Sequence, residues 1–260
     1  NNKMIKHPKI LSKRFCKEMI ENTSKYFTPA FRGTWKVWNV KDSESVEYIL
    51  SEYSDIIPDG SKPLWINFID YNVGVGLNAL LQVTTGGRNV AVGKNVLEVC
   101  TTGQYNTAIG YEALRANTTA HNNVAVGKAA LKANTTGANN VALGYLALRV
   151  NTTGGQNIGI GAGGNLGANT TGTYNVGIGY DALNANTTAS NNTAVGRSAL
   201  SANTTGASNL AIGHYAMSGN TTGSFNTAYG YTALQSNTTG TNNVAIGREA
   251  MISNTTASNN

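Results

Sequence analysis

The chain contains 260 residues, 12% of them charged, and carries a formal net charge of +6. The basic side chains are dispersed, because residues 1–71 hold 11 basic and 9 acidic residues and residues 72–260 hold 8 and 4. Nucleic-acid binding calls for Lys and Arg gathered on one face, so we expect no nucleic-acid partner. The sequence has no apolar run of transmembrane length and no signal segment at its start, so we also expect no membrane insertion.

Residues 1–71 lack periodicity and predict a small α+β module. The apolar spacing of residues 10–20 and of residues 43–53 suits two amphipathic helices. Residues 34–40 alternate in a way typical of a strand, and residues 64–69 predict a last strand that leads into the following segment. We expect this module to cap that segment or to attach it to another protein, because stacked strands end in unpaired edges.

From Asn72 to Asn260 a 17-residue unit is repeated eleven times, and a twelfth copy begins. Each copy opens with the pattern Asn-x-(Ala/Gly)-x-Gly, and one copy, residues 157–174, has 18 residues. A fixed period of this length is typical of stacked repeats, and we expect the repeats to continue beyond the last residue. We number the positions of the repeat from the opening asparagine as columns 1 to 17. These asparagines are Asn72, Asn89, Asn106, Asn123, Asn140, Asn157, Asn175, Asn192, Asn209, Asn226, Asn243 and Asn260.

Four columns indicate how one copy folds. Column 4 is mostly Val or Ile and is never charged, so we expect it to point into a core. Column 3 is always Gly or Ala, and since successive strand residues face opposite sides, we expect it to lie against another closely packed layer. Column 5 is always Gly, which predicts a corner with positive φ or without room for a side chain. Column 9 is Leu or Met, which we expect to be a second inward anchor.

Columns 12 to 15 read Asn-Thr-Thr-Gly or Asn-Thr-Thr-Ala from the third copy onward. Asn and Gly at fixed offsets favour turns, and identical residues stacked on one another can form hydrogen-bonded ladders. The simplest fold is an all-β repeat rod, a parallel β-solenoid or β-roll with one 17-residue repeat per coil, preceded by the α+β cap. At about 4.8 Å per layer, the repeats would give a rod of roughly 50 Å.

Two other structures, a disordered spacer and a helix, are compatible with parts of such a sequence. Asn-Thr-Thr-Gly has low complexity, which suits disorder, but a disordered spacer has no reason to keep aliphatic residues in phase. The six residues after the column 5 glycine, such as residues 111–116, have helical propensity but are too few for an independent helix. A single helical turn at a corner remains compatible with the pattern.

The unit Asn-(Val/Thr)-Ala-(Val/Ile)-Gly resembles the head repeat of trimeric autotransporter adhesins, which fold as left-handed parallel β-rolls packed around a threefold axis. The longer phrase at residues 106–119, Asn-Thr-Ala-Ile-Gly-Tyr-Glu-Ala-Leu-Arg-Ala-Asn-Thr-Thr, is similar to repeats in bacteriophage tail-fibre proteins and in fibre-like proteins of large marine viruses. The resemblance covers residues 72–260 and departs from the adhesin heads in period, which is shorter there. It implies a homotrimeric surface fibre whose residues 1–71 contact other fibre or virion proteins.

The composition of the repeat also suits a homotrimer. Each coil offers only about three bulky aliphatic side chains, which is a thin core for a single chain. The small-residue side formed by column 3 invites close packing with a partner or an opposing wall.

Column 6, just after the glycine corner, is the candidate contact surface. Its aromatic and cationic side chains suit a cell-surface glycan or an anionic polymer through stacking and charge. The same side chains can instead shield a corner while their polar tips reach water. The candidate residues are Tyr111, Lys128, Tyr145, Tyr180, Arg197, His214, Tyr231 and Arg248.

No catalytic group recurs in the repeats, and we expect neither an enzyme nor a cofactor or metal site. Residues 159–164 match Gly-x-Gly-x-x-Gly, but two of these glycines belong to columns 3 and 5 and no acidic residue follows until Asp181. Cys16 and Cys100 match no metal-ligand spacing, and Cys100 takes the place of a column 12 asparagine. The carboxylate pair expected of a depolymerising enzyme is also missing from the repeats.

The sequence therefore favours a structural fibre segment at a virion surface or outside the cell. Such a segment acts as a spacer and adhesion rod that carries or presents receptor-binding parts. The alternative is an ice-binding β-solenoid with a threonine ladder. Adjacent threonines face opposite sides of a strand, so Thr-Thr supplies one outward column where Thr-x-Thr would supply two, and this geometry disfavours the alternative.

Overall fold

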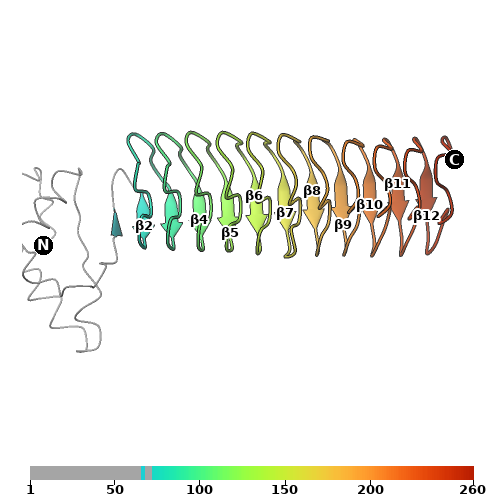
Figure 1. The fold of residues 1–260 in the computed structure, drawn as a ribbon, viewed down its shortest axis with the longest axis horizontal. Helices are drawn as coiled ribbons and strands as arrows, with labels where there is room; N and C mark the ends of the chain where they lie inside the picture. The colour runs from blue at the N-terminus through green and yellow to red at the C-terminus, as the bar shows by residue number, and fades with distance from the viewer. Residues whose placement is uncertain (1–65, 68–71) are drawn as a thin grey trace, which may run out of the picture.

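The computed structural model describes residues 66–67 and 72–260, and this part of the chain contains twelve β-strands and no helix (Figure 1). A two-residue strand precedes eleven three-residue strands, one in each copy of the repeat. Turns and bends connect them, so the helical turn considered for the corner is absent from these residues. The strands are β1 (Ile66–Asn67), β2 (Val73–Val75), β3 (Val90–Val92), β4 (Thr107–Ile109), β5 (Val124–Val126), β6 (Val141–Leu143), β7 (Ile158–Ile160), β8 (Val176–Ile178), β9 (Thr193–Val195), β10 (Leu210–Ile212), β11 (Thr227–Tyr229) and β12 (Val244–Ile246).

The strands form one sheet in sequence order. From β2 to β12 all neighbours are parallel and pair column on column, so that Ala91 lies opposite Gly74 of the preceding strand and Ala108 of the following one. Figure 1 shows the coils stacked in a row from β2 to the C-terminus. The prediction of a parallel β-solenoid with one repeat per coil is confirmed.

The first coil is paired on its outer edge by β1, which runs antiparallel to β2 with Ile66 opposite Val75. The strand predicted at residues 64–69 is therefore present at residues 66–67, but it runs against the coil direction and does not continue the spiral. It covers backbone groups of β2 that would otherwise be an open sheet edge. The two helices and the tryptophan-containing strand predicted further upstream lie outside the described residues, so the capping or attachment module stays a prediction.

The interior of each coil is narrow and is filled mainly from columns 3, 8 and 9. Column 3 is Gly or Ala, column 8 is Ala in nine of the eleven copies, and both are buried through most of the rod. Column 9 is fully buried from Leu97 to Leu234. Its predicted inward position is confirmed, and it supplies one large apolar side chain per coil.

Column 4 faces outward, contrary to the prediction that it points into the core. In every strand from β2 to β12 the middle residue, column 3, is buried, while columns 2 and 4 are partly or fully exposed. Strand alternation places neighbours on opposite sides but does not decide which side is inside. Beside the buried leucine column the interior has room only for a methyl group, so the small column lies inside and the branched column outside.

Column 1 forms a continuous ladder of buried asparagines. The side-chain Oδ1 of each one accepts a hydrogen bond from the backbone N–H of the next. The backbone N–H of Asn157, for example, lies 2.9 Å from Oδ1 of Asn140. Asn140 also donates from Nδ2 to the carbonyl of Gly154, column 15 of the same coil, at 2.9 Å. A single amide thus joins two coils and fixes the corner between columns 15 and 1.

Two further ladders run beside it. From Asn134 to Asn254, each column 12 asparagine donates from Nδ2 to Oδ1 of the asparagine one coil earlier. Cys100 occupies column 12 one coil before Asn117, the first asparagine of this ladder, and burial raises the pKa of its thiol. The column 13 hydroxyls donate to the threonine carbonyl one coil later, as Thr118 does to Thr135 at 3.2 Å. The predicted stacking of identical residues into hydrogen-bonded ladders is confirmed.

The corner at column 5 requires glycine. Gly110 has a φ of 122°, and a Cβ in its place would lie 2.7 Å from the carbonyl oxygen of Gly127 in the next coil. Columns 7, 9 and 17 also have positive φ, although almost none of their residues is glycine. Their N–H groups bond to a neighbouring coil, as Leu97 does to the carbonyl of Ala113 at 3.2 Å, and this pairing holds the left-handed conformation.

The 18-residue coil departs from the pattern in its core. Asn165 occupies column 8, and its Nδ2 donates to the carbonyl of Gly179 at 2.9 Å. Its Oδ1 is buried without a hydrogen-bond partner. Column 3 is Gly159 in this coil and Gly177 in the next, and a Cβ at Gly177 would lie 2.8 Å from that Oδ1. Column 3 is glycine and not alanine in these two coils because the Asn165 side chain occupies the space of the alanine methyl groups.

We expect Gly177→Ala and Asn165→Ala to be strongly coupled. Alone, Gly177→Ala should lower the free energy of unfolding by about 1–2 kcal/mol, because the new methyl group overlaps Asn165. In an Asn165→Ala background the same change should be neutral or stabilising, since it restores the alanine found in column 3 of eight other copies. A double-mutant cycle from urea unfolding measures this coupling, and additive effects would contradict the packing explanation.

Candidate functional site

The predicted contact residues of column 6 line one edge of the rod, because each follows the column 5 corner of its own coil. Four of them are tyrosines, and their exposed fractions lie between 42% for Tyr111 and 53% for Tyr180. The stacking of the coils therefore brings all the predicted residues into one line, which we call the corner stripe. It consists of Tyr111, Lys128, Tyr145, Tyr180, Arg197, His214, Tyr231 and Arg248.

Cations and aromatic rings of the corner stripe lie against each other. The Nζ atom of Lys128 lies 5.7 Å from the ring centre of Tyr145. The guanidinium carbon of Arg197 lies 5.9 Å from the ring centre of Tyr180. Distances of this size are typical of cation–π contacts, which restrict the rotamers of both partners. The corner stripe is thus partly ordered before any ligand is present.

His214 is held among aromatic rings. It stacks on Tyr215 with ring centres 4.2 Å apart, and the edge of Tyr231 lies 5.7 Å away. Arg248 covers the ring of Tyr231 at 5.6 Å. Sequence reasoning missed Tyr215, which belongs to column 7. The one signal for it in the sequence is that no other residue of this column is aromatic.

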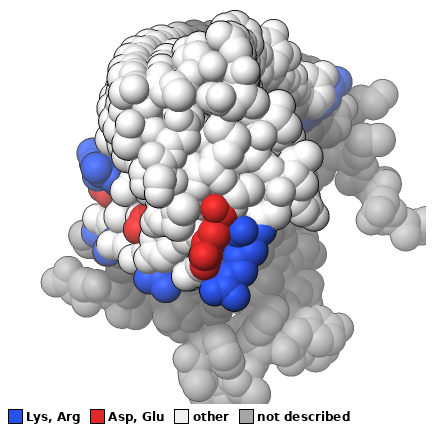
Figure 2. Space-filling view, turned by 90° about the vertical axis from the view of Figure 1, so that its right-hand side faces the viewer, with Lys and Arg blue, Asp and Glu red and all other residues white. Residues whose placement is uncertain are grey.

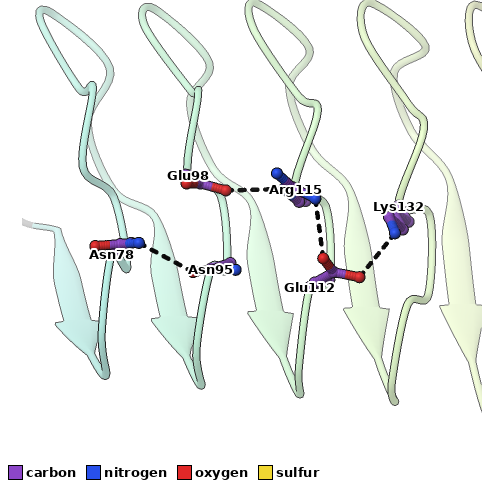
Figure 3. A network of polar contacts seen from close by, with 6 residues as sticks. All are labelled: Asn78, Asn95, Glu98, Glu112, Arg115 and Lys132. Carbon is purple, nitrogen blue, oxygen red and sulfur yellow. Dashed lines mark hydrogen bonds and ion pairs between the residues drawn. The ribbon is translucent and has the colours of Figure 1, made fainter.

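An ion-pair network joins side chains of columns 7 and 10 (Figure 3), and its residue Glu112 directly follows Tyr111 of the corner stripe. Arg115 donates from Nε to Glu98 at 2.8 Å and from Nη1 to Glu112 at 2.9 Å. The Nζ atom of Lys132 lies 2.8 Å from the other carboxylate oxygen of Glu112. The network spans three successive coils, and the hydrogen bond from Lys132 lowers the pKa of Glu112 below its usual value.

We expect Glu112→Gln to lower the free energy of unfolding by about 0.5 kcal/mol near neutral pH, a value typical of partly exposed ion pairs. The pKa of Glu112 is lower in the folded chain than in the unfolded one. Its contribution is therefore present above the unfolded pKa, about 4.3, and is lost as the pH falls through the folded value. Urea unfolding of both proteins across this range measures the difference, and a difference that persists in acid would point to packing instead.

The charged side chains of the rod gather on one side. Eleven of the twelve charged residues between Asn72 and Asn260 belong to columns 6, 7 and 10, and the twelfth is Arg88 in column 17. Figure 2, an end-on view, shows blue and red side chains mostly along the lower edge and a largely white surface elsewhere. Two other sides of the coil, formed by columns 2 to 4 and by columns 13 to 16, therefore carry no charge.

The outer side of the sheet is a continuous apolar surface, which we call the aliphatic face. Val, Ile or Leu occupies all but four of its 22 positions, and Ile109 and Ile178 are 39% and 36% exposed. Sequence reasoning missed this surface because it assigned column 4 to the core. The face consists of Val73, Val75, Val90, Val92, Thr107, Ile109, Val124, Val126, Val141, Leu143, Ile158, Ile160, Val176, Ile178, Thr193, Val195, Leu210, Ile212, Thr227, Tyr229, Val244 and Ile246.

The threonine columns differ in what their hydroxyl groups do. Column 14 is exposed in all eleven coils. The column 13 hydroxyls are engaged with backbone carbonyls, as between Thr135 and Thr152 at 3.1 Å. The expectation that Thr-Thr supplies one outward column is confirmed.

The described residues contain no group of three or more His, Cys, Asp or Glu side chains that could hold a metal ion. They also contain no helix long and apolar enough to cross a membrane. The Gly-x-Gly-x-x-Gly match at residues 159–164 lies at the end of β7 and in the following turn, and no helix follows it. A dinucleotide site would need that helix, so the match reflects the repeat columns.

No protein-family model matches the chain, and no curated protein or solved structure is significantly similar to it. The function has to be argued from the surfaces that the coil builds. These are the aliphatic face, the corner stripe and the exposed threonine column.

Proposed function

We propose that the chain is a structural fibre segment, a spacer and adhesion rod on a virion or cell surface that associates into a homotrimer through its aliphatic face. The observation that carries this proposal is an uncharged surface that continues from β2 to β12 and is aliphatic in every coil except that of β11, which presents Thr227 and Tyr229. We infer no catalytic role, because no catalytic group recurs along the described coils.

The size of the aliphatic face supports association. A strip about 50 Å long and roughly 10 Å wide covers about 500 Å², which is within the range of about 300–600 Å² found for the largest apolar patch of a monomer, and such patches are often functional. Burying such a surface against another apolar surface is favourable in proportion to its area.

The regularity of the face favours another copy of the chain as the partner. Its apolar side chains recur with the coil spacing, about 4.8 Å, and a second copy presents matching rows at the same spacing. An irregular partner would not need the same chemistry in every coil. The number of three copies comes from the resemblance of the repeat to trimeric adhesin heads and viral fibres.

A rod of this construction suits a spacer. Each coil contacts only its neighbours, so length increases with the number of repeats without changing the packing. The asparagine and threonine ladders run along the axis and join every coil to the next. In this proposal residues 1–71 attach the rod to other fibre or virion proteins, and receptor-binding parts are carried or presented by it.

Sedimentation and imaging of the purified chain test the proposal. In native buffer the mass should equal three chains, and electron micrographs should show a straight rod with threefold symmetry. A mass of one chain at micromolar concentration would overturn the trimer, and a globular particle would overturn the rod.

Ice binding is a second candidate function because one threonine column is exposed in every coil. Column 14 presents one hydroxyl and one methyl group per coil on an uncharged side of the rod. Because the column 13 hydroxyls are already bonded to carbonyls, only one regular threonine column faces water. Thermal hysteresis of the purified chain would favour this candidate over the fibre.

A further inference from the structure

We propose that the corner stripe binds a linear acidic polysaccharide that lies parallel to the rod axis, with a neutral sugar alternating with an acidic one. This inference goes beyond the structural role, and it does not depend on how many copies associate. It rests on the order of side chains along the stripe and on their exposure.

Three tyrosines of the corner stripe occupy every second coil. Tyr111, Tyr145 and Tyr180 belong to the third, fifth and seventh copies of the repeat. Two layers of the sheet are separated by about 9.6 Å, which is close to the length of a disaccharide unit in an extended chain. Exposed tyrosine rings offer an apolar face for the C–H groups of a sugar ring and a hydroxyl for its polar edge. One disaccharide can therefore be matched to each pair of coils.

One cation lies between these tyrosines and two flank them. Lys128 lies between Tyr111 and Tyr145, Lys94 in column 6 of the second copy precedes Tyr111, and Arg197 follows Tyr180, whereas the coil between Tyr145 and Tyr180 carries Ala162. Lys128 and Arg197 lie over one face of the Tyr145 and Tyr180 rings, and none of the three cations makes an ion pair with a described acidic residue. Their charges can therefore meet the carboxylates of a ligand that lies along the stripe.

The 18-residue coil leaves room for one of these rings. It carries Ala162 in column 6, followed by Gly163 and Gly164 in the inserted turn. A Cβ at Gly163 would lie 2.6 Å from the ring of Tyr180. The absence of a side chain at Gly163 thus lets the Tyr180 ring lie against the preceding coil and stay in line with the other tyrosines.

The density of charge favours a polysaccharide over a nucleic acid. A single nucleic-acid strand carries one phosphate per about 3.4 Å, whereas the two nearest cations of column 6, Lys94 and Lys128, lie two layers or about 9.6 Å apart, and Lys128 and Arg197 lie four layers apart. A polymer with one acid group per disaccharide matches this density, and a polymer with a charge on every residue does not.

Binding of the full chain to hyaluronan, which alternates a uronate with a neutral hexosamine, tests the inference. The double substitution Tyr145→Ala/Tyr180→Ala should weaken binding by about 25-fold, if each exposed ring contributes about fivefold, or roughly 1 kcal/mol. Lys128→Gln should weaken it by about fivefold and reduce its dependence on salt. The matched control is Tyr105→Ala/Tyr174→Ala in column 17, since these tyrosines are 48% and 55% exposed on another corner. This control should bind within about twofold of the wild type.

Four outcomes would overturn the inference. They are no binding to hyaluronan, equal losses in the control and stripe variants, equal or tighter binding to single-stranded DNA at physiological salt, and binding of a neutral linear glucan as tight as that of hyaluronan. Sedimentation of the same samples separates this inference from the fibre proposal. A trimeric rod that binds no polysaccharide would support the fibre proposal and exclude polysaccharide binding by the corner stripe.

Discussion

Asn140→Asp is expected to lower the free energy of unfolding by about 3 kcal/mol or more near neutral pH. Asn140 is fully buried, and its Nδ2 donates to the carbonyl of Gly154 at 2.9 Å while its Oδ1 accepts from the backbone of Asn157. Aspartate keeps the acceptor but replaces the donor with an oxygen that faces another oxygen. The described coils have no Lys or Arg in a buried column beside this carboxylate, so both the lost hydrogen bond and the uncompensated charge destabilise the coil.

The neighbouring residue provides a matched control. Asn139 lies in column 17 and is exposed, so Asn139→Asp makes the same chemical change in water and should shift the urea midpoint only slightly. The pKa of the new carboxyl at position 140 should be raised by burial, since the charged form is disfavoured there. The penalty of Asn140→Asp is therefore largest at neutral pH and decreases as the pH falls towards the unfolded pKa, where a protonated carboxyl can donate to Gly154. Equal midpoints for the two variants would mean that the asparagine ladder contributes little to stability.

The period of the sequence was sufficient to predict the coil. An invariant glycine, a column of Leu or Met and stacked asparagines recur at fixed offsets, and only layers in register bring such columns together.

The prediction of which strand face is buried was wrong for a physical reason. Alternation gives two faces, and the larger aliphatic side chains were assigned to the interior because apolar residues are usually buried. In a 17-residue coil the interior is already occupied by leucine and two rows of asparagine, so it admits only alanine or glycine from the strand.

The turns could not be predicted from residue types. Leu114 and Glu112 have φ values of 49° and 58°, and neither residue type favours the left-handed region. Their conformation follows from hydrogen bonds to adjacent coils, such as Glu112 to the carbonyl of Lys94 at 3.0 Å. A single coil would not adopt these turns alone. Apart from the glycines of column 5, the asparagines of column 17, such as Asn139, and of column 7, Asn78 and Asn95, signal positive φ in the sequence, because asparagine tolerates this region.

The corner stripe was predictable as a line of residues because it depends only on the period. Its cation–π contacts join column 6 to column 6 of the adjacent coil, as Lys128 does to Tyr145. The contacts beside the stripe were not predictable, since they join different columns: His214 stacks on Tyr215 of its own coil, and Glu112 binds Lys132 of the next one. Contacts of this kind depend on side-chain directions around the corner, which the repeat pattern does not contain.

Ile109→Lys/Ile178→Lys is expected to convert the proposed trimer into single chains while leaving the coil folded. Both side chains are more than a third exposed in the single chain, so the solenoid itself should accept lysine there. In an assembly that buries the aliphatic face, each lysine would place an unpaired charge in an apolar contact, at a cost of several kcal/mol. Sedimentation measures the mass, and circular dichroism reports whether the sheet is retained.

The matched control is Thr119→Lys/Thr188→Lys, which alters the exposed threonine column of the same two coils. Both variants gain two positive charges per chain, so repulsion between whole chains is the same in each. If only the isoleucine variant sediments as a single chain, assembly depends on the aliphatic face and not on net charge. If both variants remain trimeric, the chains meet on another side of the coil, and the exposed aliphatic residues must be covered by a different partner.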